Sequence, residues 1–399
     1  MGKQNMLFND SLEAEKIITS ICHTNKVSGF THDFYKYPAR FPPSFARQII
    51  KTFSAENDLV VDPFMGGGTT LVEANILGRR AIGTDISPLA TFISKVKTNI
   101  YTKEDLEIIE GWLLKVQPKL NLHRKVDRHW KWIDEGYQRN INSSDTWPIR
   151  KLIELFISEL KELSIKKHRD FARCLLLRTT QWAIDNRLII PTANEIRNQM
   201  LSFFYEFSVG AKEFNEAVYE YDDFFNINDN RRVECLNVSS KDFSQYLDES
   251  PKLILTSPPY PGVHVLYHRW QVHGRKETPA PFWIANCKDG HGESFYTMGG
   301  RSEYGISRYF ESLSDSMKSI FEICNNDSVL VQVVAFSDIN DQFNHYLEIL
   351  DRIGYIEKFI PSLSNSPDGR IWRVVPNRKW YTKDNTTSSQ EVVLFHKIS

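Results

Sequence analysis

The sequence of 399 residues predicts an α/β fold, a doubly wound and mostly parallel sheet that is interrupted by a helical insertion. Between residues 59 and 98, short apolar runs alternate with amphipathic segments, as buried strands and covering helices do. Strand patterns then stop and resume only after residue 231. We expect a cofactor-binding half at 1–100, a mainly helical insertion at 101–230 and a catalytic half at 231–399.

Composition narrows the class of protein. Hydrophobic residues make up 41% and charged residues 25%, which is typical of a globular protein and argues against global disorder. A net charge of −1 means that any nucleic acid must meet a local basic surface. The five cysteines include no Cys-x-x-Cys pair, so a reduced, cytoplasmic setting is expected. No apolar run approaches about 18 residues, so no membrane span is expected.

The first distinctive segment is rich in proline: Tyr37-Pro38-Ala39-Arg40-Phe41-Pro42-Pro43. Its three prolines forbid a helix interior and favour a rigid, extended loop. Ser44 then has the character of a helix N-cap, because Phe45, Ile49 and Phe53 follow at the spacing of one helix face.

A glycine turn follows the buried strand expected at Leu59–Asp62, in the order Pro63-Phe64-Met65-Gly66-Gly67-Gly68-Thr69-Thr70. Consecutive glycines allow positive φ and a close approach of the backbone to a ligand. Thr69 and Thr70 open a helix whose first N–H groups suit a carboxylate or a phosphate, and Gly78 ends it. No Lys follows the glycines, which excludes a phosphate-loop NTPase, but a dinucleotide site or a purely structural turn remains open.

Two acidic residues flank this turn. Asp85 ends the next expected strand, at 79–85, where its carboxylate can accept hydrogen bonds from two ribose hydroxyls. Asp62, directly before the turn, suits a cationic or amino-bearing ligand. S-adenosylmethionine meets all three features, because it carries a carboxylate for the helix end, an ammonium and a sulfonium for the acid, and a ribose for Asp85.

A second loop indicates a more specific chemistry than the glycine turn does. Thr256-Ser257-Pro258-Pro259-Tyr260 follows an apolar run at Leu253–Thr256. Prolines have no N–H, so this turn presents carbonyl oxygens without competing donors from its prolines. An exocyclic amino group needs two acceptors for its two hydrogens, and Tyr260 could stack on the ring that bears it. The alternative is a rigid loop with a packed tyrosine.

These motifs resemble those of the S-adenosylmethionine-dependent DNA amino-methyltransferases, which methylate cytosine N4 or adenine N6. Phe64 to Gly68 matches the family's Phe-x-Gly-x-Gly motif, and Ser257 to Tyr260 is the catalytic motif in the form more typical of cytosine-N4 enzymes. The resemblance implies a Rossmann-like class I methyltransferase fold that ends in an antiparallel hairpin. In this chain the insertion precedes the third strand, so we leave open whether residues 101–230 recognise the DNA target.

The resemblance also implies roles for individual residues. The catalytic residues would be Ser257, Pro258, Pro259 and Tyr260. The cofactor-binding residues would be Tyr37, Pro38, Phe41, Asp62, Pro63, Phe64, Gly66, Gly68, Thr69, Thr70 and Asp85. No residue is expected to bind a metal, because the histidines at 264, 268, 273 and 291 have no carboxylate or Cys at a familiar spacing.

The expected reaction is methylation of cytosine N4 in double-stranded DNA, on a base flipped out of the duplex. A restriction–modification or defence system, with a cognate restriction endonuclease as partner, would be the setting. The alternatives are an adenine-N6 enzyme, a non-catalytic DNA-binding protein that keeps the cofactor fold, and a dinucleotide oxidoreductase, which leaves Thr256 to Tyr260 unexplained.

Three further segments carry expectations. Residues 262–308 have little periodicity and should form a loop that shapes the substrate pocket. The basic and aromatic stretches at 119–139 and 370–383 could contact DNA, and the second, beside the catalytic sheet, is the stronger candidate. A helix at 309–323, a strand at 328–336, a helix at 340–353 and β segments at 355–361 and 391–396 should complete the chain.

Overall fold

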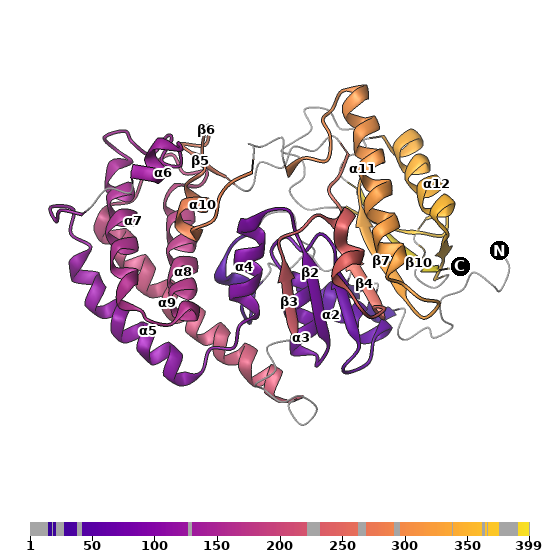
Figure 1. The fold of residues 1–399 in the computed structure, drawn as a ribbon, viewed down its shortest axis with the longest axis horizontal. Helices are drawn as coiled ribbons and strands as arrows, with labels where there is room; N and C mark the ends of the chain where they lie inside the picture. The colour runs from indigo at the N-terminus through magenta and orange to yellow at the C-terminus, as the bar shows by residue number, and fades with distance from the viewer. Residues whose placement is uncertain are drawn as a thin grey trace.

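A computed structural model gives the fold of the chain (Figure 1). It describes residues 15–17, 19–20, 28–37, 42–126, 130–221, 232–261, 269–290, 296–336, 338–360, 364, 366–374 and 390–398. Of the expected site residues, Pro38 and Phe41 lie outside these ranges. Within them, no helix is both long and apolar enough to cross a membrane.

The centre of the described structure is an eight-stranded sheet with the order β3-β2-β1-β4-β7-β10-β8, in which β9 pairs with β10. The strands are β1 (Leu59–Asp62), β2 (Arg80–Thr84), β3 (Val233–Leu236), β4 (Leu253–Thr256), β7 (Val329–Val334), β8 (Tyr355–Lys358), β9 (Ile371–Val374) and β10 (Gln390–Ile398). The pairs from β3 to β7 are parallel, whereas β10 runs antiparallel to β7, β8 and β9. This confirms the predicted parallel sheet with antiparallel strands at its C-terminal end.

Helices cover both faces of the sheet, as the continuous burial of its central strands requires. The helices that pack on it are α2 (Pro43–Phe53), α3 (Thr69–Ile76), η6 (Ser240–Tyr246), α11 (Glu303–Glu322) and α12 (Asn344–Ile353). In β4, Leu253 and Leu255 belong to the core beneath α2 and α3, while Ile254 belongs to the core beneath α11 and α12. Side chains that alternate between faces therefore build two separate cores from one strand.

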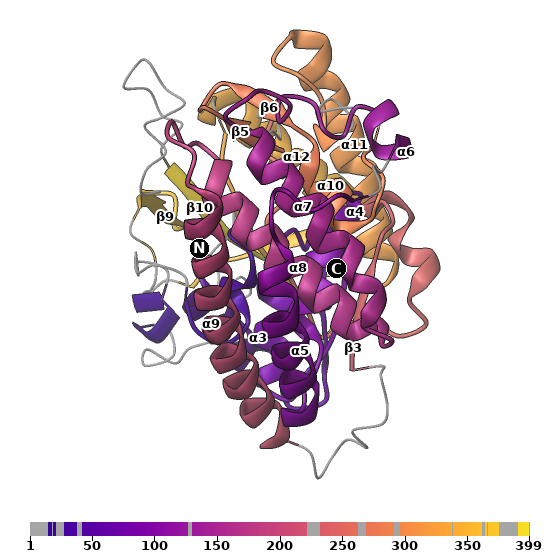
Figure 2. The same cartoon turned by 90° about the vertical axis from the view of Figure 1, so that its left-hand side faces the viewer.

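The second unit is helical and lies beside the sheet (Figures 1 and 2). Its elements are α5 (Lys103–Val116), α6 (Trp130–Asp134), α7 (Trp147–Glu159), α8 (Lys166–Ile184), α9 (Ala193–Tyr219), β5 (Trp270–Val272), β6 (Lys276–Thr278) and α10 (Ala280–Ala285). One hydrophobic core runs from these helices to α4 (Pro88–Thr98), where it includes Leu89 and Ile93. This shared core fixes the helical unit against the α/β half.

The expectation for residues 262–308 was wrong in one respect. Instead of an unstructured loop, its described part forms the hairpin β5–β6, helix α10 and the first residues of α11. Trp270, Phe282 and Trp283 are buried in the core of the helical unit. The large buried surface of these aromatic side chains stabilises the segment. Its helix and strands are too short to produce a regular hydrophobic periodicity in the sequence.

Most predicted boundaries hold within a few residues. β1 has the predicted bounds, and Gly78, with φ +75°, follows the end of α3 as expected. Helix α2, however, begins at Pro43 rather than after an N-cap at Ser44, because proline is well tolerated in the first turn. The predicted helix at 340–353 starts as a π-turn, Ile339–Phe343, before α12.

Candidate functional site

The candidate site lies where the order of the sheet reverses. Strands β1 and β4 are neighbours, with Val61 opposite Ile254, and the chain proceeds to opposite edges of the sheet from them. In open parallel sheets, ligands bind at such a switch point, beyond the carboxyl ends of the strands. Asp62 ends β1 and Thr256 ends β4, so both predicted motifs begin at this point.

Asp62 connects the two motifs. Its Oδ1 accepts hydrogen bonds from Thr256 Oγ1 at 2.7 Å and from the Phe64 amide at 3.1 Å, and its Oδ2 accepts one from Thr70 Oγ1 at 2.7 Å. Its exposed fraction is only 3%, and burial raises its pKa to about 6 against the opposing effect of these donors. Because Asp62 already accepts three hydrogen bonds, its role in this structure is to connect β1, α3 and β4.

The glycine turn is closely packed. Gly66 and Gly68 have φ of +47° and +75°, which side chains rarely adopt. A Cβ at Gly67 would lie 2.7 Å from Tyr37 Cβ, and one at Gly68 would lie 2.7 Å from Ser94 Oγ. Tyr37 therefore packs directly against the glycine turn and forms one of its walls.

Helix α4 holds the carbonyls of the turn from the other side. Ser94 Oγ donates to Gly66 O at 3.0 Å, and the buried Lys97 Nζ donates to Gly67 O at 3.0 Å. Pro63 is fixed in the same way, because Thr84 Oγ1 donates to its carbonyl at 3.0 Å. These contacts leave the start of α3 at Thr69 as the source of unpaired N–H groups beside the turn.

Asp85 lies directly across the turn. Its Oδ2 accepts from the Gly66 amide at 3.0 Å and its Oδ1 accepts from the Ser87 amide at 2.8 Å. Each oxygen keeps a lone pair, which is the acceptor pair that two ribose hydroxyls need. Burial raises the pKa of Asp85 to about 6, opposed by these two amides and increased further by the nearby Asp62.

These residues fit a bound S-adenosylmethionine. Asp85 would accept from the ribose, the start of α3 would receive the carboxylate, and Tyr37 would border the pocket. Phe64 packs partly into the core beneath α11 and α12, on the side toward β4. The chemistry of the donors and acceptors therefore matches the cofactor without any ligand beyond these side chains and amides.

The second loop presents an oriented hydroxyl. Ser257 Oγ lies 2.9 Å from Val333 O and 3.3 Å from Tyr260 Oη. A carbonyl can only accept, so the Ser257 proton points to Val333 and the oxygen keeps its lone pairs for another donor. Pro258 is buried, whereas Pro259 and Tyr260 are partly exposed.

Tyr260 is held from strand β10. Its hydroxyl lies 2.8 Å from Glu391 Oε1, and Arg373 donates to Glu391 Oε2 from Nε at 2.9 Å and from a terminal nitrogen at 2.7 Å. The phenol has one proton and a carboxylate only accepts, so Tyr260 donates to Glu391. Sequence reasoning missed both partners. The signal was a lone Glu that opens an otherwise apolar strand.

Of the predicted DNA surface at 370–383, the structure describes only the first residues, 370–374, whose arginines are ion-paired. Arg370 binds Glu357 through two hydrogen bonds of 2.7 Å and also contacts Asp368. Because Arg373 likewise binds Glu391, both Arg370, which precedes β9, and Arg373 within it form ion pairs inside the protein. A short strand that pairs with β10 explains their position, and residues 375–389 lie outside the described ranges.

The basic stretch at 119–139 is also partly internal. Lys119 and Arg124 both bind Glu159, at 2.7 and 2.6 Å, and Lys119 reaches Glu162 as well. These pairs fix the loop after α5 to the end of α7. Lys119 and Arg124 therefore make contacts within the helical unit, and Arg128 lies outside the described residues.

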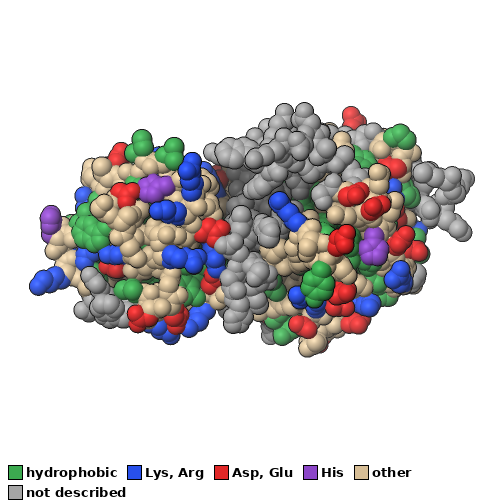
Figure 3. All heavy atoms as spheres, turned by 90° about the horizontal axis from the view of Figure 1, so that it is seen from above, with side chains coloured by type: hydrophobic (Ala, Val, Ile, Leu, Met, Phe, Trp, Pro, Cys, Tyr) green, Lys and Arg blue, Asp and Glu red, His purple; other side chains and the backbone are tan. Residues whose placement is uncertain are grey.

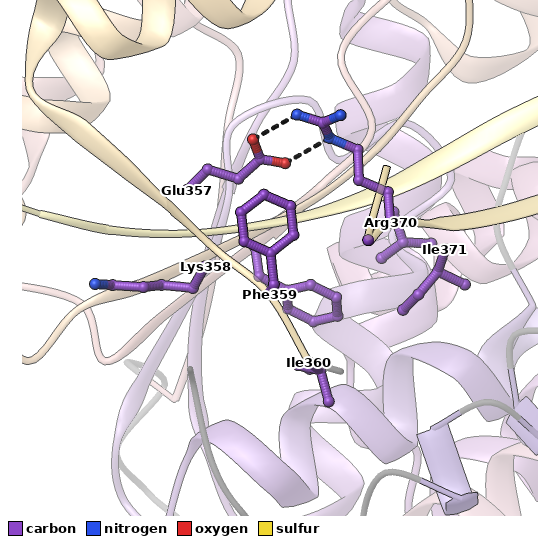
Figure 4. Close-up of a pocket in the computed structure, with 9 residues that line it drawn as sticks. Glu357, Lys358, Phe359, Ile360, Arg370 and Ile371 are labelled. Carbon is purple, nitrogen blue, oxygen red and sulfur yellow. Dashed lines mark hydrogen bonds and ion pairs between the residues drawn. The ribbon is translucent and has the colours of Figure 1, made fainter. Parts of the chain in front are cut away.

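A cavity of about 10 Å³ lies between β8, β9 and β10 (Figure 4). It is lined by Glu357, Phe359, Arg370 and Ile371, and its volume is about that of one water molecule. None of its residues belongs to the two motifs. Among the described side chains, no three His, Cys, Asp or Glu residues are arranged to hold a metal ion, and the histidines at 264, 268 and 291 lie outside that part of the chain.

Comparison with known proteins agrees with this geometry. Residues 7–95 match a family model described as DNA methylase. Type II methyltransferase M.MjaII of Methanocaldococcus jannaschii is 28% identical over 151 residues, which are 34% of this chain and 28% of that protein. Type II methyltransferase M.MvaI of Kocuria varians is 37% identical over 95 residues, 21% of each chain. The match thus spans about a quarter of the length of these relatives.

Among solved structures, a TehB-like SAM-dependent methyltransferase from Corynebacterium glutamicum aligns with 89% of this chain and 87% of its own. The identity is 9% and the TM-score is 0.32, so the assignment of fold rests on the sheet order above. The matched segment contains the glycine turn and Asp85. In this segment and its motifs, the chain is similar to the S-adenosylmethionine-dependent DNA amino-methyltransferases.

Proposed function

We propose that the protein transfers a methyl group from S-adenosylmethionine to N4 of a flipped cytosine in duplex DNA. One observation carries this proposal: Thr256 donates a hydrogen bond to Asp62. This bond joins the Ser-Pro-Pro-Tyr loop, which would bind the cytosine amine, to the glycine turn, which would bind the methyl donor. The lone pairs of Ser257 Oγ would then lie beside the cofactor pocket. Positioning of two reactants in this way can supply much of the rate acceleration.

The exocyclic amine of cytosine is a poor nucleophile, because its lone pair is delocalised into the ring. Ser257 Oγ would accept one of its hydrogens, and the carbonyl of Pro258 would accept the other. Two such hydrogen bonds localise the lone pair on nitrogen and fix its direction. The proton of Ser257 is already directed to Val333 O, so the hydroxyl is preset as an acceptor.

S-adenosylmethionine bound at the glycine turn would supply an electrophilic methyl group on its sulfonium, and Asp85 and the start of α3 would hold it. The nitrogen–carbon bond would form as the carbon–sulfur bond breaks, and the nitrogen would then lose one proton to water. Tyr260, whose hydroxyl is tied to Glu391, would offer its ring to the flipped base.

Cytosine rather than adenine is favoured by the residue before the two prolines. Ser257 stands where adenine-N6 enzymes more often carry Asp or Asn. Adenine N6 is the alternative target, since it has the same amine with two hydrogens.

A role in restriction and modification is the biological side of this proposal. The relatives named above are type II methyltransferases of archaea and bacteria. We propose that this chain likewise protects cytoplasmic DNA, together with a cognate endonuclease. Deleting its gene in the presence of that nuclease should be lethal to the cell.

Mass spectrometry of nucleosides tests the reaction. DNA from cells that express the protein should contain N4-methylcytosine, and DNA from cells with Ser257→Ala or Tyr260→Ala should not. N6-methyladenine instead would overturn the choice of base. Cofactor binding by calorimetry without methylation of any duplex would favour a non-catalytic DNA-binding protein.

A further inference from the structure

The loop between α8 and α9 carries an unusual apolar tip. Leu188 and Ile189 are 76% and 83% exposed, the highest values among the large hydrophobic residues that the structure describes. Two adjacent apolar side chains in water make no contribution to the core. Their exposure is therefore a cost that contact with a partner would remove.

The tip is held in shape by the hairpin β5–β6. The Asn186 amide donates to Gln271 O at 2.9 Å, and the Gln271 amide donates to Asp185 Oδ1 at 2.9 Å. His273 Nδ1 lies 3.2 Å from Leu188 O, a carbonyl that can only accept. The backbone of the tip is thus fixed by another element before any partner binds.

Basic side chains lie on the loop of the tip and on the hairpin that holds it. Arg275 and Lys276 are exposed at the turn of the hairpin, and Arg187 lies over the ring of Trp182 at 4.5 Å. Acids of the same loop and its neighbours are engaged within the protein, among them Glu195, which lies near Arg187 and accepts from the Thr192 amide. Asp145 pairs with His273, Asp185 accepts from Gln271, and Glu277 contacts Arg269. Seen from above, this face of the helical unit shows Lys and Arg side chains beside hydrophobic ones (Figure 3).

The hairpin is also anchored close to the candidate site. Trp270 Nε1 donates to Tyr35 Oη at 3.0 Å, and Tyr35 is two residues from Tyr37, the wall of the glycine turn. Eight residues lie between Pro261 and Trp270, so the chain limits the distance between these two residues to about 30 Å. The hairpin that holds the tip is therefore tethered to the catalytic loop by a segment that can span no more than about nine base pairs of one duplex.

We propose that Leu188 and Ile189 form a wedge that enters a groove of the DNA and unstacks a base step near the target, while Arg275 and Lys276 contact the flanking phosphates. Apolar side chains between base steps kink duplexes, and a kinked step costs less to open. This inference rests on the proposed function, because it assigns a DNA contact to an enzyme that must flip its base.

A double variant, Leu188→Ser with Ile189→Ser, tests the wedge in the full-length protein. The probe is a fluorescein-labelled duplex of about 40 base pairs that carries the methylated site mapped in plasmid DNA, with S-adenosylhomocysteine present. Anisotropy should show at least about tenfold weaker binding, and gel mobility should show a smaller bend. Ile165→Ser is the matched control, since Ile165 is 47% exposed at the opposite end of α8 and should change neither.

A second variant, Arg275→Ala with Lys276→Ala, should weaken binding and lower the slope of log affinity against log salt by about 2. The serine variant should leave that slope unchanged. Calorimetric affinity for S-adenosylhomocysteine should stay the same in all variants, which excludes misfolding.

Unchanged affinity and bend in the serine double variant would overturn the wedge while the proposed function stands. Dimerisation of the wild type that the same variant abolishes, with DNA binding intact, would also overturn it and identify a protein contact. If the wild-type protein methylates no DNA, the proposed function itself has failed.

Discussion

Thr256 donates a hydrogen bond of 2.7 Å to Asp62, across 194 residues of sequence and the full helical insertion. It joins the carboxyl ends of β1 and β4, and so connects the glycine turn to the Ser-Pro-Pro-Tyr loop. A buried carboxylate that loses a donor retains most of its desolvation cost. The contact is therefore both structural and a determinant of the geometry of the site.

Thr256→Val should test this link. The substitution keeps the shape of the side chain but removes the hydroxyl donor, so the free energy of unfolding in urea should fall by about 1–3 kcal/mol. Thr256→Ser keeps the donor and should lose less. Equal stability of the valine variant and the wild type would show that the contact contributes nothing.

Ionisation of Asp62 should make stability depend on pH. Its pKa in the folded protein is raised to about 6, above the unfolded value of 3.8, so its contribution is present below pH 3.8 and is lost as pH rises through 6. Relative to Asp62→Asn, wild-type stability should fall by up to about 3 kcal/mol between pH 4 and pH 7.5. Parallel curves for the two proteins would contradict this.

Asp85 should control cofactor binding through its charge. Ribose hydroxyls need the ionised carboxylate, whose pKa is about 6 before the ligand binds. Below that pH, the dissociation constant of S-adenosylhomocysteine should rise about tenfold per unit, and Asp85→Asn should bind weakly at every pH. If the pH dependence disappears in Asp62→Asn instead, Asp62 is the group that titrates.

Glu391 should affect catalysis because it holds the hydroxyl of Tyr260. Glu391→Gln keeps the size of the side chain but weakens the acceptor for the phenol and the ion pair with Arg373. We expect kcat to fall by about tenfold or more with little change in cofactor affinity, and Tyr260→Phe should behave alike. With 2-aminopurine at the target position, the flipped-base fluorescence should also change. A lowered unfolding midpoint with an unchanged signal would indicate a structural role alone.

Gly67→Ala should disturb the wall of the turn. Its new Cβ would lie 2.7 Å from Tyr37 Cβ, so Tyr37 must move and S-adenosylhomocysteine should bind at least about tenfold more weakly. Gly111→Ala in α5 is the control. A Cβ there meets nothing within 4 Å, and the helix should gain about 0.5–1 kcal/mol. Normal cofactor binding by Gly67→Ala would show that Tyr37 is not part of the cofactor pocket.

Local rules predicted a large part of the fold. The apolar run at 59–62, the glycines and Asp85 are local signals, because each depends only on residues close to it in the sequence. β1, the turn and α3 could therefore be predicted. The elements in 270–285 could not, because each is short and is stabilised by aromatic contacts with a distant helical unit. The same holds for Arg370 and Arg373, because their partners Glu357 and Glu391 come from the other strands β8 and β10.

The sequence by itself determined the likeness to DNA methylases, the parallel sheet and the two motifs, because these depend on residue types and spacing along short stretches. Only the tertiary structure decided that Asp62 joins the motifs, that Glu391 holds Tyr260 and that Leu188 and Ile189 remain exposed. Each of these facts depends on which side chains, distant in the sequence, come into contact in the folded protein. The spacing of residues along the chain does not specify those contacts.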